Sequence, residues 1–433
     1  MEKTVNSKSL IYRFFASEKI EKFFFSALLA TIFTAGLCFN MLTLSYKYLE
    51  SQAGKSFYVD FNWVFWSGMI IVLFYLVRDY GISKRAVQFD AALVVLIQTM
   101  IFVGIIGFHN EDYSNVAFTW ILPIAYIAGK VAVGKEIDEA NRRIIIIVYT
   151  FMIALFIASM LDFYTFFKYS KLYGYYLTEG WPGFWSDAMQ NRCGMSLGLF
   201  FINTSIWFAV MRRKKNPIAL GIMIILLIVS QYWGIMVQSR TITLLPVLSF
   251  FVVALIWSYE RRKSIPKAFW LGIIAIVVLI ALFVALTFAN NWFDIRTIYK
   301  TSQWGEELFE NQRIRMGRNG FRLILQNPYG KIEPPVSKWD NPHDTFLQYG
   351  RVNGIAVFIL IEIYRLITLK DVVVMSAKKG NKYDIIKYLL VPAFVCLNFN
   401  FTIDPNGYVQ RELLMMLLLV NGIIRGWNEL HET

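Results

Sequence analysis

His343 is the residue in this sequence whose type and setting best suit catalysis. It is one of three histidines in a chain of 433 residues, and it stands in the segment NPHDTFLQYG, where a long polar stretch returns to an apolar one. An imidazole has an unperturbed pKa of about 6.5, so it can act as a general base near neutral pH. A neighbouring carboxylate can orient the imidazole or raise its pKa. We therefore expect His343 and Asp344 to be catalytic; the alternative is a histidine without a special role among lipid headgroups.

Arg240 and Arg192 are candidates for binding an anionic group. Arg240, in the segment VQSRTIT, lies in a break between two apolar runs that is so short that it must stand at the membrane edge. Arg192, in SDAMQNRCGM, comes just before another apolar run and follows a long loop. A guanidinium group donates paired hydrogen bonds to phosphate oxygens. Both side chains are therefore expected to bind phosphate, and snorkelling to lipid headgroups is the alternative.

Arg313 is a third candidate ligand of an anion. The segment NQRIRMGRNGFRLILQNP predicts a helix that ends before Pro328. At about 100° per residue, Arg313 shares a face with Gly317 and Gly320, which leave room for a bulky anionic group. Three further arginines form a narrow stripe on another face: Arg315, Arg318 and Arg322. We expect Arg313 to bind the ligand and the stripe to face solvent or lipid headgroups.

The elements that position these residues must be membrane helices. Hydrophobic residues make up 57% of the chain and charged residues 17%, whereas soluble domains carry roughly 25% charged residues. This composition excludes a soluble enzyme and a disordered chain. A bilayer core of about 30 Å needs about 20 apolar residues per helix, and about twelve such runs occur. They are centred in residues 22–46, 61–78, 89–108, 114–134, 143–162, 194–211, 217–238, 241–258, 268–289, 352–369, 385–401 and 412–426. We expect an all-α polytopic membrane protein.

Basic residues predict the orientation of these spans. The net charge is +13, and the short basic clusters fall in alternate loops, which the positive-inside rule assigns to the cytoplasm. The excess charge therefore marks cytoplasmic loops rather than nucleic-acid binding. Both termini are then cytoplasmic, and the long loops 163–193 and 290–351 lie outside. We expect residues 1–433 to form a single integral membrane domain, with a long outer helical loop, 290–351, that carries the active site before the tenth span.

No motif in the sequence indicates a metal or a cofactor. His343 has no second histidine at ligand spacing, and neither a P-loop nor a nucleophile elbow occurs. One histidine and several arginines beside a bilayer suit a transfer reaction with a diphosphate leaving group. The arginines would neutralise the diphosphate, and the histidine would deprotonate an incoming hydroxyl.

Three motifs follow one another in the second half of the chain. Arg240 lies in a Ser-Arg-Thr sequence, Arg313 precedes a Pro-Tyr-Gly sequence at 328–330, and His343 is followed by ten residues and then Gly354. In this order they resemble the O-antigen ligase and O-antigen polymerase superfamily. Members of that superfamily use undecaprenyl-diphosphate-linked glycans at the outer face of the bacterial inner membrane.

The resemblance implies an inverting, metal-independent glycosyltransferase of the C-type, multi-span fold, without a cofactor. His343 would be the base, and Arg240 and Arg313 would hold the diphosphate of the donor. Arg192 joins this predicted site from its own position before an apolar run, not from the resemblance. A ligase joins the finished polymer to the lipid A core, whereas a polymerase joins one repeat unit to another; a capsule or exopolysaccharide polymerase is also open. The order of the motifs favours the ligase slightly, although the chain departs from the ligase pattern at Asp344 and Val357.

A transporter or flippase for a lipid-linked anion is the alternative from another class. Such a protein would also place arginines in a membrane cavity. Transporters, however, tend to carry internal repeats and ionisable residues near the bilayer midplane. The spans of this chain show neither feature, because their charges gather at their outer ends. Glycosyl transfer is therefore the favoured expectation.

Overall fold

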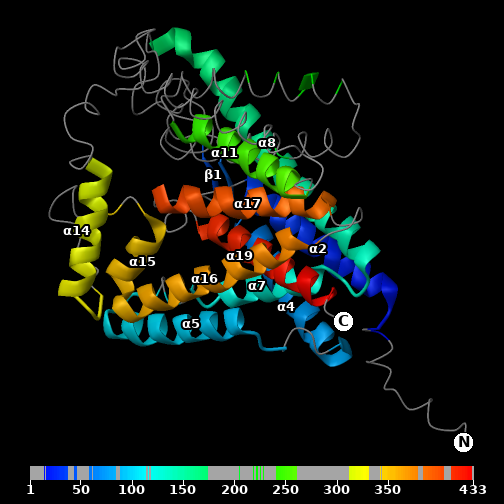
Figure 1. The fold of residues 1–433 in the computed structure, drawn as a ribbon, viewed down its shortest axis with the longest axis horizontal. Helices are drawn as coiled ribbons and strands as arrows, with labels where there is room; N and C mark the ends of the chain where they lie inside the picture. Colours follow the sequence, from blue (N-terminus) through cyan, green and yellow to red (C-terminus); the bar gives the residue numbers. More distant parts are fainter. Residues whose placement is uncertain are drawn as a thin grey trace, which may run out of the picture. The chain divides into compact units, whose positions relative to one another are not determined.

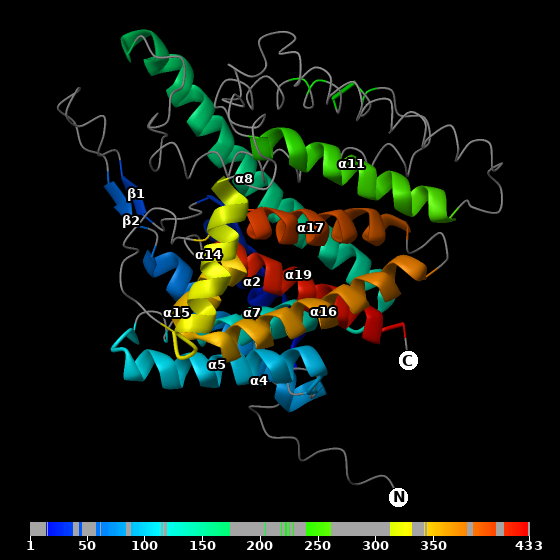
Figure 2. The same cartoon turned by 60° about the vertical axis from the view of Figure 1, so that its left-hand side comes forward.

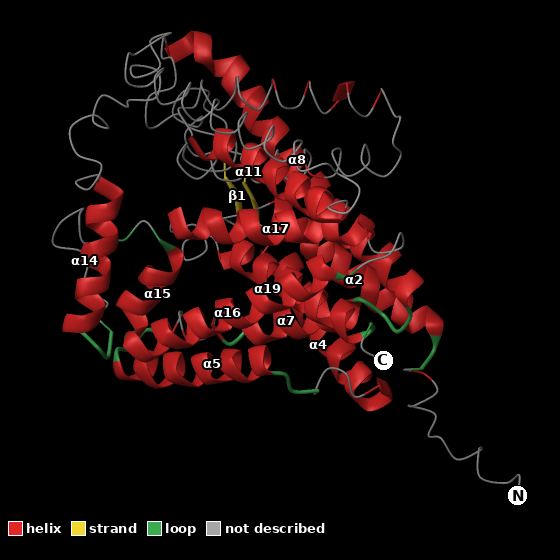
Figure 3. Cartoon of the chain, viewed as in Figure 1, coloured by secondary structure: helices red, strands yellow, loops and turns green. Residues whose placement is uncertain are grey.

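A computed structural model describes the chain over most of its length. The described residues are 14, 16–37, 43–45, 58–60, 62–83, 88–113, 116, 119–173, 204, 218, 221–222, 225, 228, 240–260, 312–330, 342, 344–378, 384–403 and 411–431. The regular elements among the described residues are helices apart from one antiparallel pair of short strands, and described loops connect some of them (Figure 3).

The chain divides into two compact units, each built from separate stretches of sequence. Unit 1 comprises Met1–Ala158, Ile359–Met375 and Val409–Thr433, and unit 2 comprises Ser159–Phe358 and Ser376–Tyr408. The expectation that residues 1–433 form a single membrane domain stays a prediction.

Unit 1 is a group of helices drawn from both ends of the chain (Figure 1). Its elements are α2 (Glu18–Leu37), β1 (Thr43–Ser45), β2 (Tyr58–Asp60), α4 (Asn62–Ser83), α5 (Ala91–His109), α7 (Leu122–Ala132), the part of α8 (Ile137–Tyr173) up to Ala158, residues Ile359–Met375 of α16 (Ile355–Ala377), and α19 (Arg411–Glu429).

Four helices of unit 1 are long and apolar enough to cross a membrane. They are Glu18–Leu37, Trp63–Ile82, Ala91–His109 and Ile137–Ile157. Large apolar side chains on them point outward, as Trp63, Val77 and Ile105 do, which suits lipid because a helix facing water would bury such groups. The described part of the chain is therefore compatible with a polytopic membrane protein.

Glycines allow α7 and α19 to pack backbone against backbone. A Cβ on Gly422 would lie 2.0 Å from the carbonyl oxygen of Tyr126, and one on Gly129 would lie 2.1 Å from that of Leu419. Gly426, four residues after Gly422, contacts the backbone of Lys130 in the same way. This spacing of small residues is typical of close helix pairs in membranes. The contact fixes α19, from the end of the chain, to a helix of the N-terminal third.

Unit 2 contains the segments with the predicted catalytic and phosphate-binding residues. Its described elements are the end of α8, α11 (Arg240–Glu260), α14 (Gln312–Gln326), α15 (Thr345–Asn353), the start of α16 and α17 (Asp384–Ile403). Helices α11 and α17 run antiparallel: Glu260 forms an ion pair with Lys387, and the Cys396 thiol lies 3.7 Å from the carbonyl oxygen of Leu245. Figures 1 and 2 show α14 running across the direction of both helices.

Several predicted spans coincide with helices, and others differ. The predicted helix before Pro328 is confirmed as α14. The first span, 22–46, is wrong at its end, because α2 stops at Leu37 and Thr43–Ser45 pairs with Tyr58–Asp60 as a strand. The predicted span 352–369 begins later, since Gly354 separates α15 from α16. The predicted spans 194–211, 217–238 and 268–289 lie outside the described residues, isolated positions apart, and the number of twelve spans stays a prediction.

Candidate functional site

Asp344 is the N-cap of α15. It has an extended backbone, and its Oδ1 atom accepts hydrogen bonds from the backbone N–H groups of Phe346 at 2.7 Å and Leu347 at 2.9 Å. A carboxylate at this position satisfies two donors that the helix itself leaves open and also faces the positive end of the helix dipole. Asp344 therefore fixes the start of the helix that His343 directly precedes. His343 itself lies outside the described residues, so its role stays a prediction.

Two glycines lock the turn after α14 onto the junction between α15 and α16. Gly354 has a φ of +88° and a ψ of 174°, a region that essentially only glycine adopts. A Cβ on Gly354 would lie 2.3 Å from the carbonyl oxygen of Pro328, and one on Gly330 would lie 2.2 Å from that of Val352. The same Pro328 oxygen accepts a 2.9 Å hydrogen bond from the Ile355 backbone N–H. We call this contact of Pro328, Gly330, Gly354 and Ile355 the glycine clasp.

The clasp joins two motifs that are separate in the sequence. Pro328 and Gly330 belong to the Pro-Tyr-Gly sequence that follows Arg313, and Gly354 ends the motif that begins at His343. Both glycines are required by the backbone geometry that they adopt rather than by a ligand. The contact therefore gives a physical reason for the residue types at these spacings.

Helices α14 and α15 lie side by side and run in the same direction. Gly320 faces Pro342, Ile324 faces Gly350, and the turn after α14 meets the end of α15. A Cβ on Gly320 would lie 2.8 Å from the Pro342 side chain. The space beside Gly320, expected to receive an anionic ligand, is therefore filled by Pro342. Gly317 has nothing within 4 Å among the described residues, so its side of α14 keeps the expected room.

The rest of α14 agrees with the predicted pattern. Arg315, Arg318 and Arg322 are all exposed, and Met316 and Ile324 are buried. Arg313 is in the first turn of α14, about 10 Å along the axis from Gly320 at 1.5 Å per residue, but its side chain lies outside what the structure describes.

Helix α17 brings the start of α11 to the same end of unit 2 as α15. The Phe346 ring, in the first turn of α15, packs on the Phe401 ring near the end of α17, with centroids 6.5 Å apart. Because α11 and α17 are antiparallel, the start of α11, whose first residue is Arg240, lies toward that end of α17. The Arg240 side chain and the whole of Arg192 lie outside the described residues. The backbone positions of Arg240, Arg313 and Asp344 thus share one end of unit 2.

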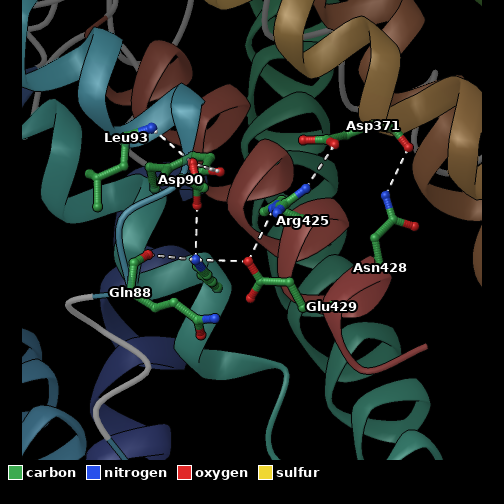
Figure 4. A network of polar contacts seen from close by, with 9 residues as sticks. Gln88, Asp90, Leu93, Asp371, Arg425, Asn428 and Glu429 are labelled. Atoms are coloured by element: carbon green, nitrogen blue, oxygen red, sulfur yellow. Dashed lines mark hydrogen bonds and ion pairs between the residues drawn. The ribbon is translucent and has the colours of Figure 1, made fainter. Parts of the chain in front are cut away.

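A second cluster of charges, in unit 1, was not singled out from the sequence. The Lys130 side chain is 1% exposed, and its ammonium nitrogen lies 2.8 Å from Asp90 Oδ2, 2.9 Å from Glu429 Oε1 and 3.0 Å from the carbonyl oxygen of Gln88 (Figure 4). All three ammonium protons can therefore be donated to oxygen. The signal was a lysine and an aspartate inside two predicted apolar runs, 114–134 and 89–108, and neither residue was assigned a role from the sequence.

Arg425 extends this cluster across α16 and α19. Its guanidinium lies 3.0 Å from Glu429 Oε1 and 3.4 Å from Asp371 Oδ1. The Asn428 side chain donates a 2.9 Å hydrogen bond to the backbone carbonyl of Asp371 (Figure 4). The charges are partnered within the cluster, which is the condition under which buried ions are tolerated.

The ion pairs of unit 1 join helix ends that the positive-inside rule had all assigned to the cytoplasmic side of the membrane. The Lys130 cluster connects the start of α5 with the ends of α7, α16 and α19. Glu21, near the start of α2, pairs with Arg78 near the end of α4 at 3.0 Å and with Arg143 near the start of α8 at 2.6 Å. In unit 2, Glu260 and Lys387 are likewise from ends with the same predicted side. The predicted alternation of the loops is consistent with this grouping.

Comparison with known proteins adds no relative from which a function could be transferred. No family model matches the chain, and no curated protein matches it.

Proposed function

We propose that the chain is a membrane glycosyltransferase of the O-antigen ligase type. It would transfer a glycan from undecaprenyl diphosphate to an acceptor hydroxyl, with the lipid A core as acceptor. Its place would be the bacterial inner membrane, with about twelve spans, both termini in the cytoplasm and the reaction at the outer face. No metal and no cofactor take part in the proposed reaction.

The glycine clasp is the observation that carries this proposal. It ties the turn after α14 to the junction between α15 and α16 through two glycine contacts and a 2.9 Å hydrogen bond from the Ile355 backbone N–H to the Pro328 carbonyl oxygen. The Pro-Tyr-Gly motif and the motif from His343 to Gly354 are thus in direct contact, which gives a reason for their occurring together in one chain. The start of α11, with Arg240, lies toward the same end of unit 2.

In the proposed reaction, His343 removes the proton of the acceptor hydroxyl while the acceptor oxygen forms a bond to the anomeric carbon. The bond from that carbon to the diphosphate oxygen breaks, and undecaprenyl diphosphate leaves with the electron pair. Arg240 and Arg313, with Arg192, neutralise the charge that develops on the leaving group. Attack opposite the leaving group inverts the anomeric configuration. Asp344 holds the start of α15 and so fixes the backbone next to the base.

A repeat-unit polymerase would use the same donor and the same base, with a glycan as acceptor. Asp344 beside the base is the observation that favours this second candidate, because the ligase pattern has a neutral residue there. A strain that lacks the protein distinguishes the two by electrophoresis of its surface glycans. Loss of a ligase leaves bare lipid A core while long polymer stays on the carrier lipid; loss of a polymerase leaves cores capped with one repeat unit.

The test of glycosyl transfer itself is an assay with purified protein and lipid-linked glycan. We expect His343→Ala to abolish product formation and His109→Ala to leave it unchanged, because His109 is exposed at the end of α5 and remote in the sequence from every motif. Both variants should insert into membranes like the parent protein. Full activity of His343→Ala would overturn the proposed mechanism.

A further inference from the structure

The exposed side of α14 carries two different surfaces next to each other. Arg315, Arg318 and Arg322 form what we call the basic face. On one flank of it lie Phe321, 46% exposed, and Leu325, 53% exposed. At about 100° per residue, Leu325 and Phe321 follow Arg318 around the helix, so charge and apolar surface adjoin along its length. On the opposite side of α14, Met316 and Ile324 are buried, Gly320 faces Pro342, and Ile324 faces Gly350 of α15.

The direction of α14 differs from that of the apolar helices in its unit. Helices α11 and α17 contain apolar stretches, Leu245–Glu260 and Ile386–Thr402, and run antiparallel to each other. Figures 1 and 2 show α14 crosswise to both of them, near the end where α11 begins. If α11 and α17 cross the bilayer, a helix across their ends runs along the membrane surface.

We infer that α14 lies in the headgroup layer and that its basic face binds anionic phospholipids. The guanidinium groups pair with lipid phosphates, and Phe321 and Leu325 enter the adjoining acyl region. This is the arrangement of interfacial helices, which combine buried apolar area with attraction to anionic lipid. The apolar flank distinguishes this partner from a soluble polyanion, to which Phe321 and Leu325 would contribute nothing. The inference does not depend on glycosyl transfer and holds for any activity of the chain.

The depth of α14 can be measured with a fluorescent label on the full chain in lipid nanodiscs. Its three cysteines are first changed by Cys38→Ala, Cys193→Ala and Cys396→Ala. An environment-sensitive fluorophore is then placed by Leu325→Cys or, as a matched control, by Gln326→Cys. Both positions are exposed and adjacent, but they lie about 100° apart, on opposite sides of the basic face. We expect acyl-chain nitroxide lipids to quench the label at 325 strongly and the label at 326 weakly.

The lipid preference is measured with the same label and two quenchers. Nitroxide-labelled phosphatidylglycerol should quench the label at 325 more than nitroxide-labelled phosphatidylcholine does. An arginine near an anionic surface raises binding about fivefold, so Arg318→Gln with Arg322→Gln should reduce the preference by up to about 25-fold. Lys135→Gln with Arg142→Gln removes the same charge from exposed positions in unit 1 and should leave the preference intact.

Three results would overturn the inference. The first is a label at 325 that no nitroxide lipid quenches, which would place this side of α14 in water. The second is equal quenching by the two lipids in the parent chain, which would remove the role of the arginines. The third is a label that responds to soluble dextran sulfate but not to phosphatidylglycerol, which would make a polyanion the partner.

Discussion

Gly354→Ala is the substitution that most directly tests the glycine clasp. The backbone at Gly354, with φ +88° and ψ 174°, costs a residue with a Cβ about 1–3 kcal/mol. The new Cβ would also lie 2.3 Å from the Pro328 carbonyl oxygen, so the two segments must separate. Separation removes the hydrogen bond from Ile355 to Pro328, whose net contribution is about 0.5–1.5 kcal/mol. We therefore expect a loss of about 2–4 kcal/mol in the free energy of unfolding.

The matched control is Gly317→Ala, the same change on a helical glycine with nothing within 4 Å among the described residues. Alanine is favoured over glycine in a helix by about 1 kcal/mol, so this variant should be as stable as the parent or slightly more stable. Both variants are compared by thermal unfolding in detergent, and Gly354→Ala is also compared with the parent in the transfer assay. Gly354→Ala should melt earlier and lose most of its activity, because the end of α15 is no longer held against the turn after α14. A Gly354→Ala variant with parental melting temperature and activity would refute the clasp as a structural requirement.

Other substitutions separate structural from chemical roles. Asp344→Ser keeps an N-cap acceptor and should retain stability, whereas Asp344→Ala should cost about 0.5–2 kcal/mol; comparing the activity of the two shows whether the carboxylate itself is needed. Arg240→Lys and Arg313→Lys lose the planar pair of guanidinium donors. We expect each to raise the activation free energy of glycan transfer by about 2–4 kcal/mol. Parental transfer rates in both variants would remove these arginines from the mechanism. Lys130→Met leaves two carboxylates without their shared cation and should destabilise the protein by about 3–5 kcal/mol, whereas the exposed Lys135→Met should melt like the parent.

The sequence was most informative where one helix face differed from another. The bounds of α14 and its exposed arginine stripe followed from a regular spacing and a proline after its end. Hydropathy alone, however, did not separate the end of α2 from the strand Thr43–Ser45, because the partner strand Tyr58–Asp60 is remote from that run. Whether such a segment continues a helix or forms a strand depends on the segment with which its backbone pairs, and composition does not reveal that partner.

Tertiary contacts account for the remaining differences. The room expected beside Gly320 is taken by Pro342, a residue 22 positions away that no local pattern connects to α14. The Lys130 cluster assembles from four helices, so no window of the sequence contains it. The proposed site likewise comes from separate segments of the chain, because α17 brings the start of α11 and the start of α15 to one end of unit 2. The roles of the Arg240 and Arg313 side chains stay predictions.

The contact between α7 and α19 has a consequence for how the protein is made. About 280 residues separate the end of α7 from the start of α19, so at ribosomal speeds of 5–20 residues per second the first helix waits roughly 15–60 s for the second. During that interval Gly129 has no packing partner from α19, and Lys130 lacks Glu429 as a counter-ion. In that state the Lys130 ammonium has only Asp90 and the Gln88 carbonyl oxygen as partners, and α7 lacks the helix against which its backbone packs. Chains that stop before residue 411 lack α19 altogether, so Gly129 and Lys130 never gain these contacts.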